Sequence, residues 1–297
     1  MNIRFDDIRH AVRALDLSDR SLCVHSSLRS FGWVDGGASA IVEGLLAEGC
    51  TVLVPTFTYV FAVEPLPHQR PARNGWNYDS PPHGFSGGTR VYTIDTTEIQ
   101  PYEMGAIPAA VVERPERVRG NHPLCSFSAV GPLAADLVGG QAPLHVYAPL
   151  EELVRRDGAV ALMGVGLDKM TLLHLAEQVA GRALFRRWAN GPDGLPMEVE
   201  TGGCSEGFPN LEPILSPLEK RTNVGLSTWR VFRAGATLRA AARAIRRDPH
   251  ITHCGRAGCD RCNDAVLGGP LLPLPAPGHG DGVPLRAEAD RQAPQTA

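Results

Sequence analysis

An apolar run at residues 159–165 ends in a glycine-rich turn and leads directly into an amphipathic segment at 171–177. The run is short and is bounded by Asp157-Gly158 and by Gly166, which predicts a buried β-strand. Helix-covered sheets bind ligands at the carboxyl ends of their strands, where the next helix presents free backbone N–H groups. This stretch therefore predicts an α/β fold with a ligand crevice at the end of this strand.

The amino-terminal part of the chain repeats this alternation of apolar runs and helical segments. We expect a helix over about 5–15, a strand at 21–25, a helix over 38–48 and a strand at 51–57. This spacing is that of a βαβ unit, whose helices cover a sheet. Further predicted elements are a strand followed by a loop within 198–208 and helices near 107–113, 132–137, 150–156 and 231–247.

The composition is that of a globular protein with a large core. Of the 297 residues, 43% are hydrophobic and 21% are charged, and the formal net charge is -3. Nucleic-acid and membrane-surface proteins need a concentrated basic face. The arginine-rich stretch 230–247 is better explained as the solvated side of a helix. We therefore expect neither a nucleic-acid nor a membrane partner.

The sequence also predicts the location of the protein and its division into segments. The amino terminus is polar and there is no run of about 18 apolar residues, so the protein is expected to be cytoplasmic. Seven scattered cysteines fit reduced thiols better than a disulfide framework. We expect a domain over 1–248 with a loop insertion near 64–88, a Cys/His-rich extension at 249–267, and a disordered tail at 268–297.

His174 is the most prominent candidate for chemistry, because it follows Thr171 by three residues on the helix at the predicted crevice. Residues three apart share a helix face, so both side chains can reach a ligand there. The alternative is that His174 is a hydrogen-bonded helix residue without a catalytic role. Glu177 and Glu206 are the two candidates for orienting its imidazole ring.

Two other histidines lie at turns. His25 ends a predicted strand and is followed by Ser26 and Ser27, a pattern that can present N–H groups and hydroxyls to phosphate or amide groups. A serine that simply caps a helix would leave the same pattern. His122 in the turn Asn-His-Pro is expected to anchor its loop, although a role as base or ligand is the alternative.

Cys254, Cys259 and Cys262 form a compact cluster with His253 beside them. Zinc in structural sites takes four nitrogen or sulfur ligands in tetrahedral geometry, and these residues supply that number. The spacing is not that of a standard zinc finger, and cysteines can also cluster without binding a metal. A structural zinc site is the hypothesis, and three thiolates argue against a catalytic one.

A succession of motifs between about residues 20 and 240 resembles the aminoglycoside 3-N-acetyltransferase family. No single block is specific, but their order and spacing are. The blocks are Val24-His25-Ser26-Ser27-Leu28-Arg29, Gly36-Gly37, Val54-Pro55-Thr56-Phe57-Thr58, Met104-Gly105-Ala106-Ile107-Pro108, His122-Pro123 with Ser126-Phe127 and Gly131-Pro132, and Gly164-Val165-Gly166 with Thr171 and His174-Leu175-Ala176-Glu177.

The resemblance implies a three-layer α/β/α fold with a mixed central sheet, distinct from the GCN5-related acetyltransferase fold. It implies acyl transfer from acetyl-coenzyme A, or another acyl-coenzyme A, to an amine. His174 is then the general base, Thr171 holds the thioester carbonyl and its oxyanion, and Glu206 orients His174. The segment from His25 through Ser26, Ser27 and Leu28 to Arg29 binds the coenzyme.

The sequence leaves the identity of the acceptor open. Leu172 and Leu124-Cys125 depart from the residues usual in the family. An aminoglycoside is a polycation and calls for an acidic pocket, to which Asp95, Glu98, Glu103, Glu151 and Glu152 are candidates. A biosynthetic amine is the alternative acceptor, and a non-catalytic protein that binds coenzyme A or an antibiotic is an alternative of another class. The expected assembly is a monomer or a homodimer.

Overall fold

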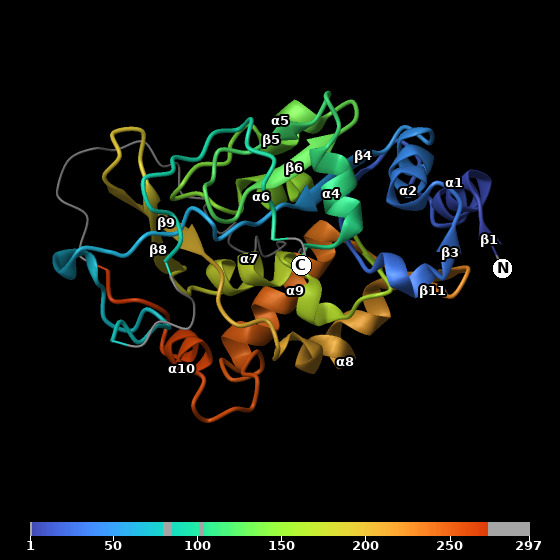
Figure 1. Ribbon diagram of the computed structural model, residues 1–297. Coiled ribbons are helices and arrows are strands. Elements are labelled where there is room, and N and C mark those ends of the chain that lie inside the picture. The colour runs from blue at the N-terminus through green and yellow to red at the C-terminus, as the bar shows by residue number, and fades with distance from the viewer. Residues whose placement is uncertain (1, 80–84, 101–103, 273–297) are drawn as a thin grey trace, which may run out of the picture.

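A seven-stranded mixed sheet forms the centre of the computed structural model, which describes residues 2–79, 85–100 and 104–272 (Figure 1). Its strand order is β10-β11-β7-β2-β4-β6-β5. In chain order these strands are β2 (Ser21–Ser26), β4 (Thr51–Pro55), β5 (Val118–Arg119), β6 (Phe127–Val130), β7 (Ala159–Met163), β10 (Glu219–Val224) and β11 (Ser227–Arg233).

Parallel pairing is confined to the middle of the sheet. β2 is parallel to both β4 and β7, and its Val24 lies opposite Ala161 of β7. The outer strands all pair antiparallel. The carboxyl ends of β2, β4 and β7 therefore lie at one edge of the sheet, where the predicted crevice belongs. The mixed sheet expected from the resemblance is confirmed.

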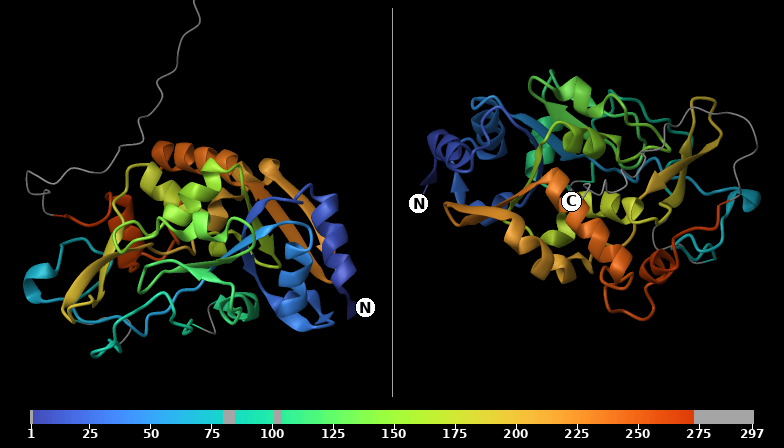
Figure 2. Two further views of the ribbon diagram at one scale, coloured as in Figure 1. Left: turned by 90° about the horizontal axis from the view of Figure 1, so that it is seen from above. Right: turned by 180° about the vertical axis from the view of Figure 1, so that it is seen from behind.

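Helices cover both faces of the sheet because the strand residues alternate between two cores (Figure 2). Leu22 and Val24 of β2 face the core that contains α1, α2 and α4, whereas Cys23 faces the core that contains α5, α6, α7 and α9. This is the three-layer arrangement. The helices are α1 (Phe5–Ala14), α2 (Gly37–Leu46), α4 (Ala106–Val112), α5 (Ala134–Val138), α6 (Ala148–Arg155), α7 (Leu172–Val179), α8 (Glu212–Leu215), α9 (Ala234–Arg247) and α10 (Asp260–Val266).

Two smaller pairs of strands lie outside the main sheet. β1 (Asn2–Ile3) and β3 (Trp33–Val34) pair in parallel, and β8 (Phe185–Asn190) and β9 (Pro196–Thr201) form an antiparallel hairpin. The hairpin supports the described part of the insertion near 64–88. The buried Asn74 side chain donates to the Arg186 carbonyl at 2.9 Å and accepts from the Arg186 N–H at 2.8 Å.

The Cys/His-rich segment 249–267 packs against the rest of the fold. The Gly75 N–H donates to Asp264 of α10 at 2.7 Å, and the Arg182 guanidinium donates to the Thr252 hydroxyl at 2.8 Å. The segment therefore contacts both the insertion and the chain after α7. Of the tail expected to be disordered, 268–297, residues 273–297 lie outside the described residues.

One predicted element is wrong at its start, and several strands were missed. The predicted helix over 231–247 begins at Ala234, because 227–233 form strand β11 with Trp229 and Val231 buried on one side. Arg230 accordingly pairs with Glu219 of β10 at 2.5 Å and does not lie on a solvated helix face. β5, β6, β8 and β10 were not predicted either.

Among the described residues, no helix combines the length and apolar character needed to span a bilayer.

Candidate functional site

A cavity of about 450 Å³ opens where the carboxyl ends of the three parallel strands meet. This is the edge at which the sequence predicts a crevice. The wall combines the ends of β2 and β4 with the turn after β7, the start of α7 and the loop after β9. Its lining residues are Val24, His25, Ser26, Pro55, Phe57, Tyr59, Met104, Pro108, Cys125, Tyr147, Val165, Asp168, Lys169, Met170, Thr171, His174, Gly202, Gly203, Ser205 and Phe208.

His174 lies in the first turn of α7 and forms part of this wall, with 9% of its surface exposed. Its Nδ1 lies 2.9 Å from Oε2 of Glu177, one helical turn further along. A carboxylate only accepts hydrogen bonds, so Nδ1 carries the proton and Nε2 keeps its lone pair. Within the part of the chain that the structure describes, Nε2 has no hydrogen-bond partner. The ring is therefore held in the tautomer that a general base needs.

The Glu177 carboxylate is held by side chains from two other segments. Its Oε1 accepts hydrogen bonds from the Arg182 guanidinium and from the Thr252 hydroxyl, the latter at 3.0 Å. Arg182 also donates to the Thr252 hydroxyl at 2.8 Å. All three side chains are buried. Glu177 therefore has a fixed position from which it orients His174.

Glu206 does not orient His174, and that prediction is wrong. Its side chain is 57% exposed and pairs with Arg256 at 2.5 Å. The spacing of three residues between His174 and Glu177 on one helix places a carboxylate at the ring without any long-range contact. Of the two candidates weighed from the sequence, Glu177 makes the contact.

Aromatic rings and a glycine hold the His174 ring from its other sides. The Tyr147 ring stacks parallel to it with centroids 6.3 Å apart, and the Phe208 ring packs edge-on at 4.7 Å. A Cβ added at Gly202 would lie 2.5 Å from the Tyr147 hydroxyl and 2.8 Å from Cδ2 of His174. Burial keeps the pKa of Tyr147 well above its ordinary value, so its hydroxyl stays protonated. Gly202 thus permits the close packing of this wall.

Thr171 immediately precedes α7 and lines the same cavity as His174. Its side chain is largely buried, and among the described residues its hydroxyl makes no hydrogen bond. The absence of a capping bond leaves that hydroxyl available to a ligand in the cavity. The structure thus brings Thr171 and His174 together, as the helix spacing predicts.

A second cleft of about 850 Å³ adjoins the cavity and follows the turn after β2. Ser26, Met104, Val165 and Lys169 line both hollows. The second cleft is further lined by Ser27, Leu28, Arg29, Gly32, Trp33, Val34, Gly36, Gly37, Gly105 and Ala106. Of the segment His25 to Arg29 predicted to bind a coenzyme, Ser26 through Arg29 line this cleft and His25 lines the cavity.

His25 and His122 are both neutral at pH 7, because burial lowers the pKa of each to about 4. The Nδ1 of His122 accepts the Cys125 N–H at 2.8 Å, so its Nε2 carries the proton and donates to the Glu200 carbonyl at 2.9 Å. Both ring nitrogens are occupied by backbone groups. His122 therefore anchors its loop, as expected.

Of the acidic residues considered for a cationic acceptor, the four that the structure describes do not line the cavity. Asp95, Glu98, Glu151 and Glu152 are absent from its lining, and Glu103 lies outside the described residues. Glu151 and Glu152 instead approach His145 and Arg155. Among the described residues, the carboxylate that lines the cavity is Asp168.

Three of the four predicted metal ligands lie close together, and Cys204 takes the place predicted for His253. The sulfur atoms of Cys254, Cys259 and Cys262 lie near that of Cys204, all within 4.8 Å of one another. His253 is wrong as the fourth member, because its Nε2 bonds to Oδ1 of Asn263 at 3.0 Å and its Nδ1 accepts the Gly255 N–H. Neither ring nitrogen is available to bind a metal.

Most of the residues that sequence reasoning missed come from distant segments. Tyr147, Thr252 and Cys204 reach the site only through long-range packing, so local spacing gives no signal for them. Arg182 lies five residues after Glu177, beyond the end of α7, where the helix spacing no longer applies. Gly202 lies in the loop predicted within 198–208, but a glycine in a predicted loop gives no signal that its backbone approaches the ring of His174.

Known proteins match this chain over most of the region just described. The family model described as aminoglycoside 3-N-acetyltransferase matches residues 23–246. Aminoglycoside N(3)-acetyltransferase IX of Micromonospora chalcea is 32% identical over 192 residues, which are 58% of this chain and 61% of the relative. Aminoglycoside N(3)-acetyltransferase III of Serratia marcescens is 32% identical over 207 residues, or 63% of this chain and 72% of the relative. The chain thus spans less than two thirds of the Micromonospora protein.

Solved structures agree with the fold over almost the whole chain. The crystal structure of the aminoglycoside acetyltransferase AAC(3)-IVa has a TM-score of 0.72 at 25% identity and covers 90% of this chain and 98% of its own. A histidine-to-alanine mutant of that enzyme in complex with a gentamicin has a TM-score of 0.70, with the same identity and coverage. Since the family model matches more than half of the chain, this protein belongs to the aminoglycoside 3-N-acetyltransferase family.

Proposed function

We propose that this protein transfers an acetyl group from acetyl-coenzyme A to an amino group of an aminoglycoside, with His174 as the general base. The observation that carries the proposal is the His174–Glu177 pair, with its Nε2 unpartnered among the described residues, at the wall of a cavity that adjoins a second cleft. Family membership supports both the donor and the class of acceptor. A cytoplasmic location, which suits seven cysteines that form no disulfide with one another, is part of the same proposal.

The second cleft is the proposed site of the coenzyme. Its lining includes Arg29 and Lys169, two exposed cations, and the glycines Gly36 and Gly37 at the start of the ten-residue helix α2. Cations and helix N-termini favour phosphate groups. The residues that it shares with the cavity let one extended ligand occupy both, so the thioester end reaches Thr171 and His174.

The chemistry follows from the tautomer of His174. The acceptor amine, bound in its neutral form, attacks the thioester carbonyl while Nε2 takes a proton from the attacking nitrogen. The positive charge on the imidazolium is stabilised by Glu177 through the Nδ1–H bond. The tetrahedral intermediate then collapses to the amide, and the departing coenzyme thiolate receives the proton from Nε2.

The Thr171 hydroxyl is the proposed donor to the oxyanion of that intermediate. It lies on the same helix turn as His174 and makes no hydrogen bond to a described residue, so it can donate without breaking a contact. A donor aimed at the developing oxyanion contributes about 3 kcal/mol in well-studied enzymes. Both substrates then bind together in a ternary complex, and no acyl-enzyme forms.

An aminoglycoside acceptor is supported by the names of the relatives and by the gentamicin complex of a structural neighbour. Asp168, which lies 3.3 Å from the Lys169 ammonium, offers one carboxylate at the cavity for an ammonium group. A biosynthetic amine is the alternative acceptor for the same machinery.

An acetylation assay tests the proposal. The purified protein is incubated with acetyl-coenzyme A and either a panel of aminoglycosides or a panel of polyamines, and free thiol is followed over time. Thiol release with aminoglycosides, with the product acetylated at the 3-amino group by NMR, is the expected result. Thiol release with polyamines alone would show that the acceptor is not an aminoglycoside. No thiol release with any of these amines would refute catalysis.

Cys125 provides a test of whether the acetyl group passes directly from the coenzyme to the amine. It lines the cavity and carries a thiol, the group on which a covalent acyl-enzyme would form. Direct transfer predicts that Cys125→Ala keeps its turnover within about threefold, since a buried thiol behaves as a small hydrophobic group with modest packing value. It also predicts intersecting lines in double-reciprocal plots with both substrates varied. Parallel lines together with an inactive Cys125→Ala variant would establish a covalent route instead.

A further inference from the structure

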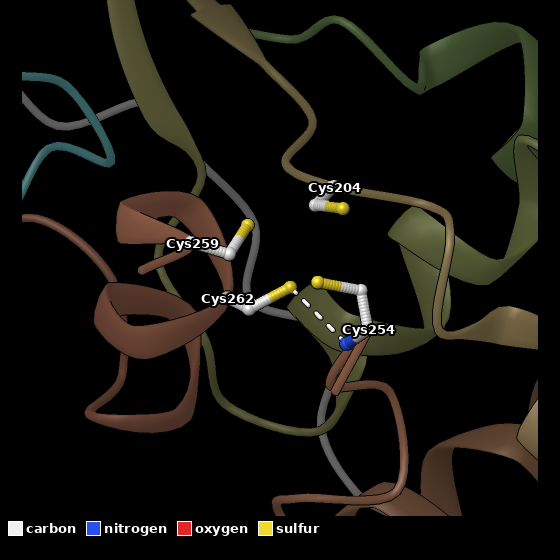
Figure 3. Close-up of side chains that lie close together, drawn as sticks. All are labelled: Cys204, Cys254, Cys259 and Cys262. Atoms are coloured by element: carbon white, nitrogen blue, oxygen red, sulfur yellow. Dashed lines mark hydrogen bonds between the residues drawn. The ribbon is translucent and has the colours of Figure 1, made fainter. Parts of the chain in front are cut away.

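Four cysteines from three separate segments meet beside the cavity (Figure 3). Cys204 follows strand β9, Cys254 lies in the loop after α9, and Cys259 and Cys262 lie at the start of α10. Their sulfur atoms all lie within 4.8 Å of one another and gather around one small space. We propose that these four sulfur atoms bind one structural Zn²⁺ ion.

The distances fit zinc with little rearrangement. A Zn–S bond is about 2.3 Å long, so the sulfur atoms of a tetrahedral site are about 3.8 Å apart. The four sulfur atoms need to approach one another by about 1 Å at most, which small side-chain rotations supply. Two of the ligands are separated by two residues, Cys259 and Cys262, a spacing typical of structural zinc sites.

The surroundings suit a site with four thiolates. The Cys254 N–H already donates to the Cys262 sulfur at 3.4 Å, a bond that stabilises negative charge on sulfur. Arg256 lies two residues after Cys254 and pairs with the Glu206 carboxylate, and Arg261 is adjacent to Cys262 in the sequence. Because the protein supplies all four ligands, no position remains for water or substrate, and the site is structural.

A disulfide is the competing explanation for close cysteines. Even two disulfides would need only two close pairs of sulfur atoms, whereas here each sulfur atom lies within 4.8 Å of the other three. The convergence of four sulfur atoms from three segments matches the coordination number of zinc and exceeds what a single cross-link requires. The two explanations differ in metal content, which is directly measurable.

The proposed ion links two parts of the site. Cys204 lies between Gly203 and Ser205, which line the cavity, and close to Gly202 against the His174 ring. Cys254 lies two residues after Thr252, whose hydroxyl donates a hydrogen bond to the Glu177 carboxylate. A zinc ion bound to both cysteines would link the loop 202–208 to the segment after α9, which contains Thr252. This positioning role rests on the proposed function, whereas the metal site itself does not.

Metal content tests the site without reference to activity. The protein is purified under reducing conditions, loaded with Zn²⁺, passed through a desalting column and analysed by mass spectrometry of elements. We expect about one zinc per chain, and less than a tenth of that in Cys259→Ser and Cys262→Ser. Cys50→Ala is the matched control, because it removes a buried thiol in the opposite core and should keep its zinc.

A second measurement serves if the serine variants fail to fold. The wild-type protein is loaded with Co²⁺, which gives the visible d–d bands of a tetrahedral thiolate site, and is then titrated with an organomercurial reagent. The bands are expected to disappear as four thiols react. Wild-type protein that holds no zinc after loading, full zinc in Cys259→Ser, or a disulfide among the four cysteines under reducing conditions would each overturn the proposal.

Discussion

The two ends of the site are built in different ways. At the cavity end, His174 and Glu177 are buried, and Arg182 and Thr252 hold the carboxylate with side-chain hydrogen bonds. At the other end, the cleft after β2 is lined by glycines and by exposed side chains such as Arg29. A reacting proton requires one fixed geometry, whereas a long ligand is held by many weak contacts. Substitutions should therefore affect kcat at the first end and KM at the second.

The largest effect is expected from His174→Ala. Removal of a general base lowers the rate by about 100- to 10,000-fold. The affinity for coenzyme A should stay unchanged, because His174 does not line the second cleft, which is the proposed coenzyme site. Steady-state kinetics gives kcat, and calorimetry with coenzyme A gives Kd. An equal loss in both quantities would mean that the two ends are not separate.

Gly202→Ala is expected to come next. The added Cβ would lie 2.8 Å from Cδ2 of His174, so the ring or the loop must move. A displacement of about 1 Å costs about 100-fold in rate, and the loss should appear in kcat. Gly140→Ala is the control, since its Cβ would meet Ala148 at an ordinary 3.6 Å. Full activity of Gly202→Ala would show that the ring is not packed as described.

Glu177→Gln and Glu206→Gln together test which carboxylate acts on His174. A hydrogen bond to a charged group contributes about 1.5–3 kcal/mol, so Glu177→Gln should lower kcat by about 10- to 100-fold with little change in KM. Glu206→Gln removes an exposed carboxylate and should stay within about twofold. The reverse ranking would restore Glu206 as the orienting residue. Circular dichroism checks that both variants are folded.

The predictable parts of this molecule are those encoded by local spacing. The apolar runs at 21–25 and 51–57 predict the central strands, and the run at 159–165 predicts the strand end beside His174. His174 and Glu177 share one short helix and Thr171 immediately precedes it, so their proximity follows from helix geometry.

The parts that could not be predicted depend on contacts between distant segments. Glu206 was favoured over Glu177 by resemblance alone, and nothing local reveals that it pairs with Arg256 in solvent. Cys204 lies 50 residues before Cys254 and reaches it only because the segment after α9 returns to the loop after β9. The predicted helix over 231–247 includes the end of strand β11, because the arginines of β11 continue into α9, although Trp229 and Val231 both face the core.

The smallest effect is expected at the opposite end, from Arg29→Ala. Arg29 is exposed, and an exposed ion pair contributes about 0.2–1 kcal/mol. The KM for acetyl-coenzyme A should therefore rise by about two- to fivefold, with kcat unchanged. The difference from the wild type should shrink as salt is added, since screening acts within about 10 Å at 0.1 M.

Arg247→Ala removes an exposed charge at the end of α9 and serves as the control for net charge. It should leave both constants as they are, because Arg247 lines neither the cavity nor the cleft. The contrast between the two ends depends on this split between KM and kcat. If Arg29→Ala lowered kcat as much as Glu177→Gln does, the cleft after β2 would be part of the reacting geometry, and the distinction between a fixed catalytic end and a distributed binding end would fail.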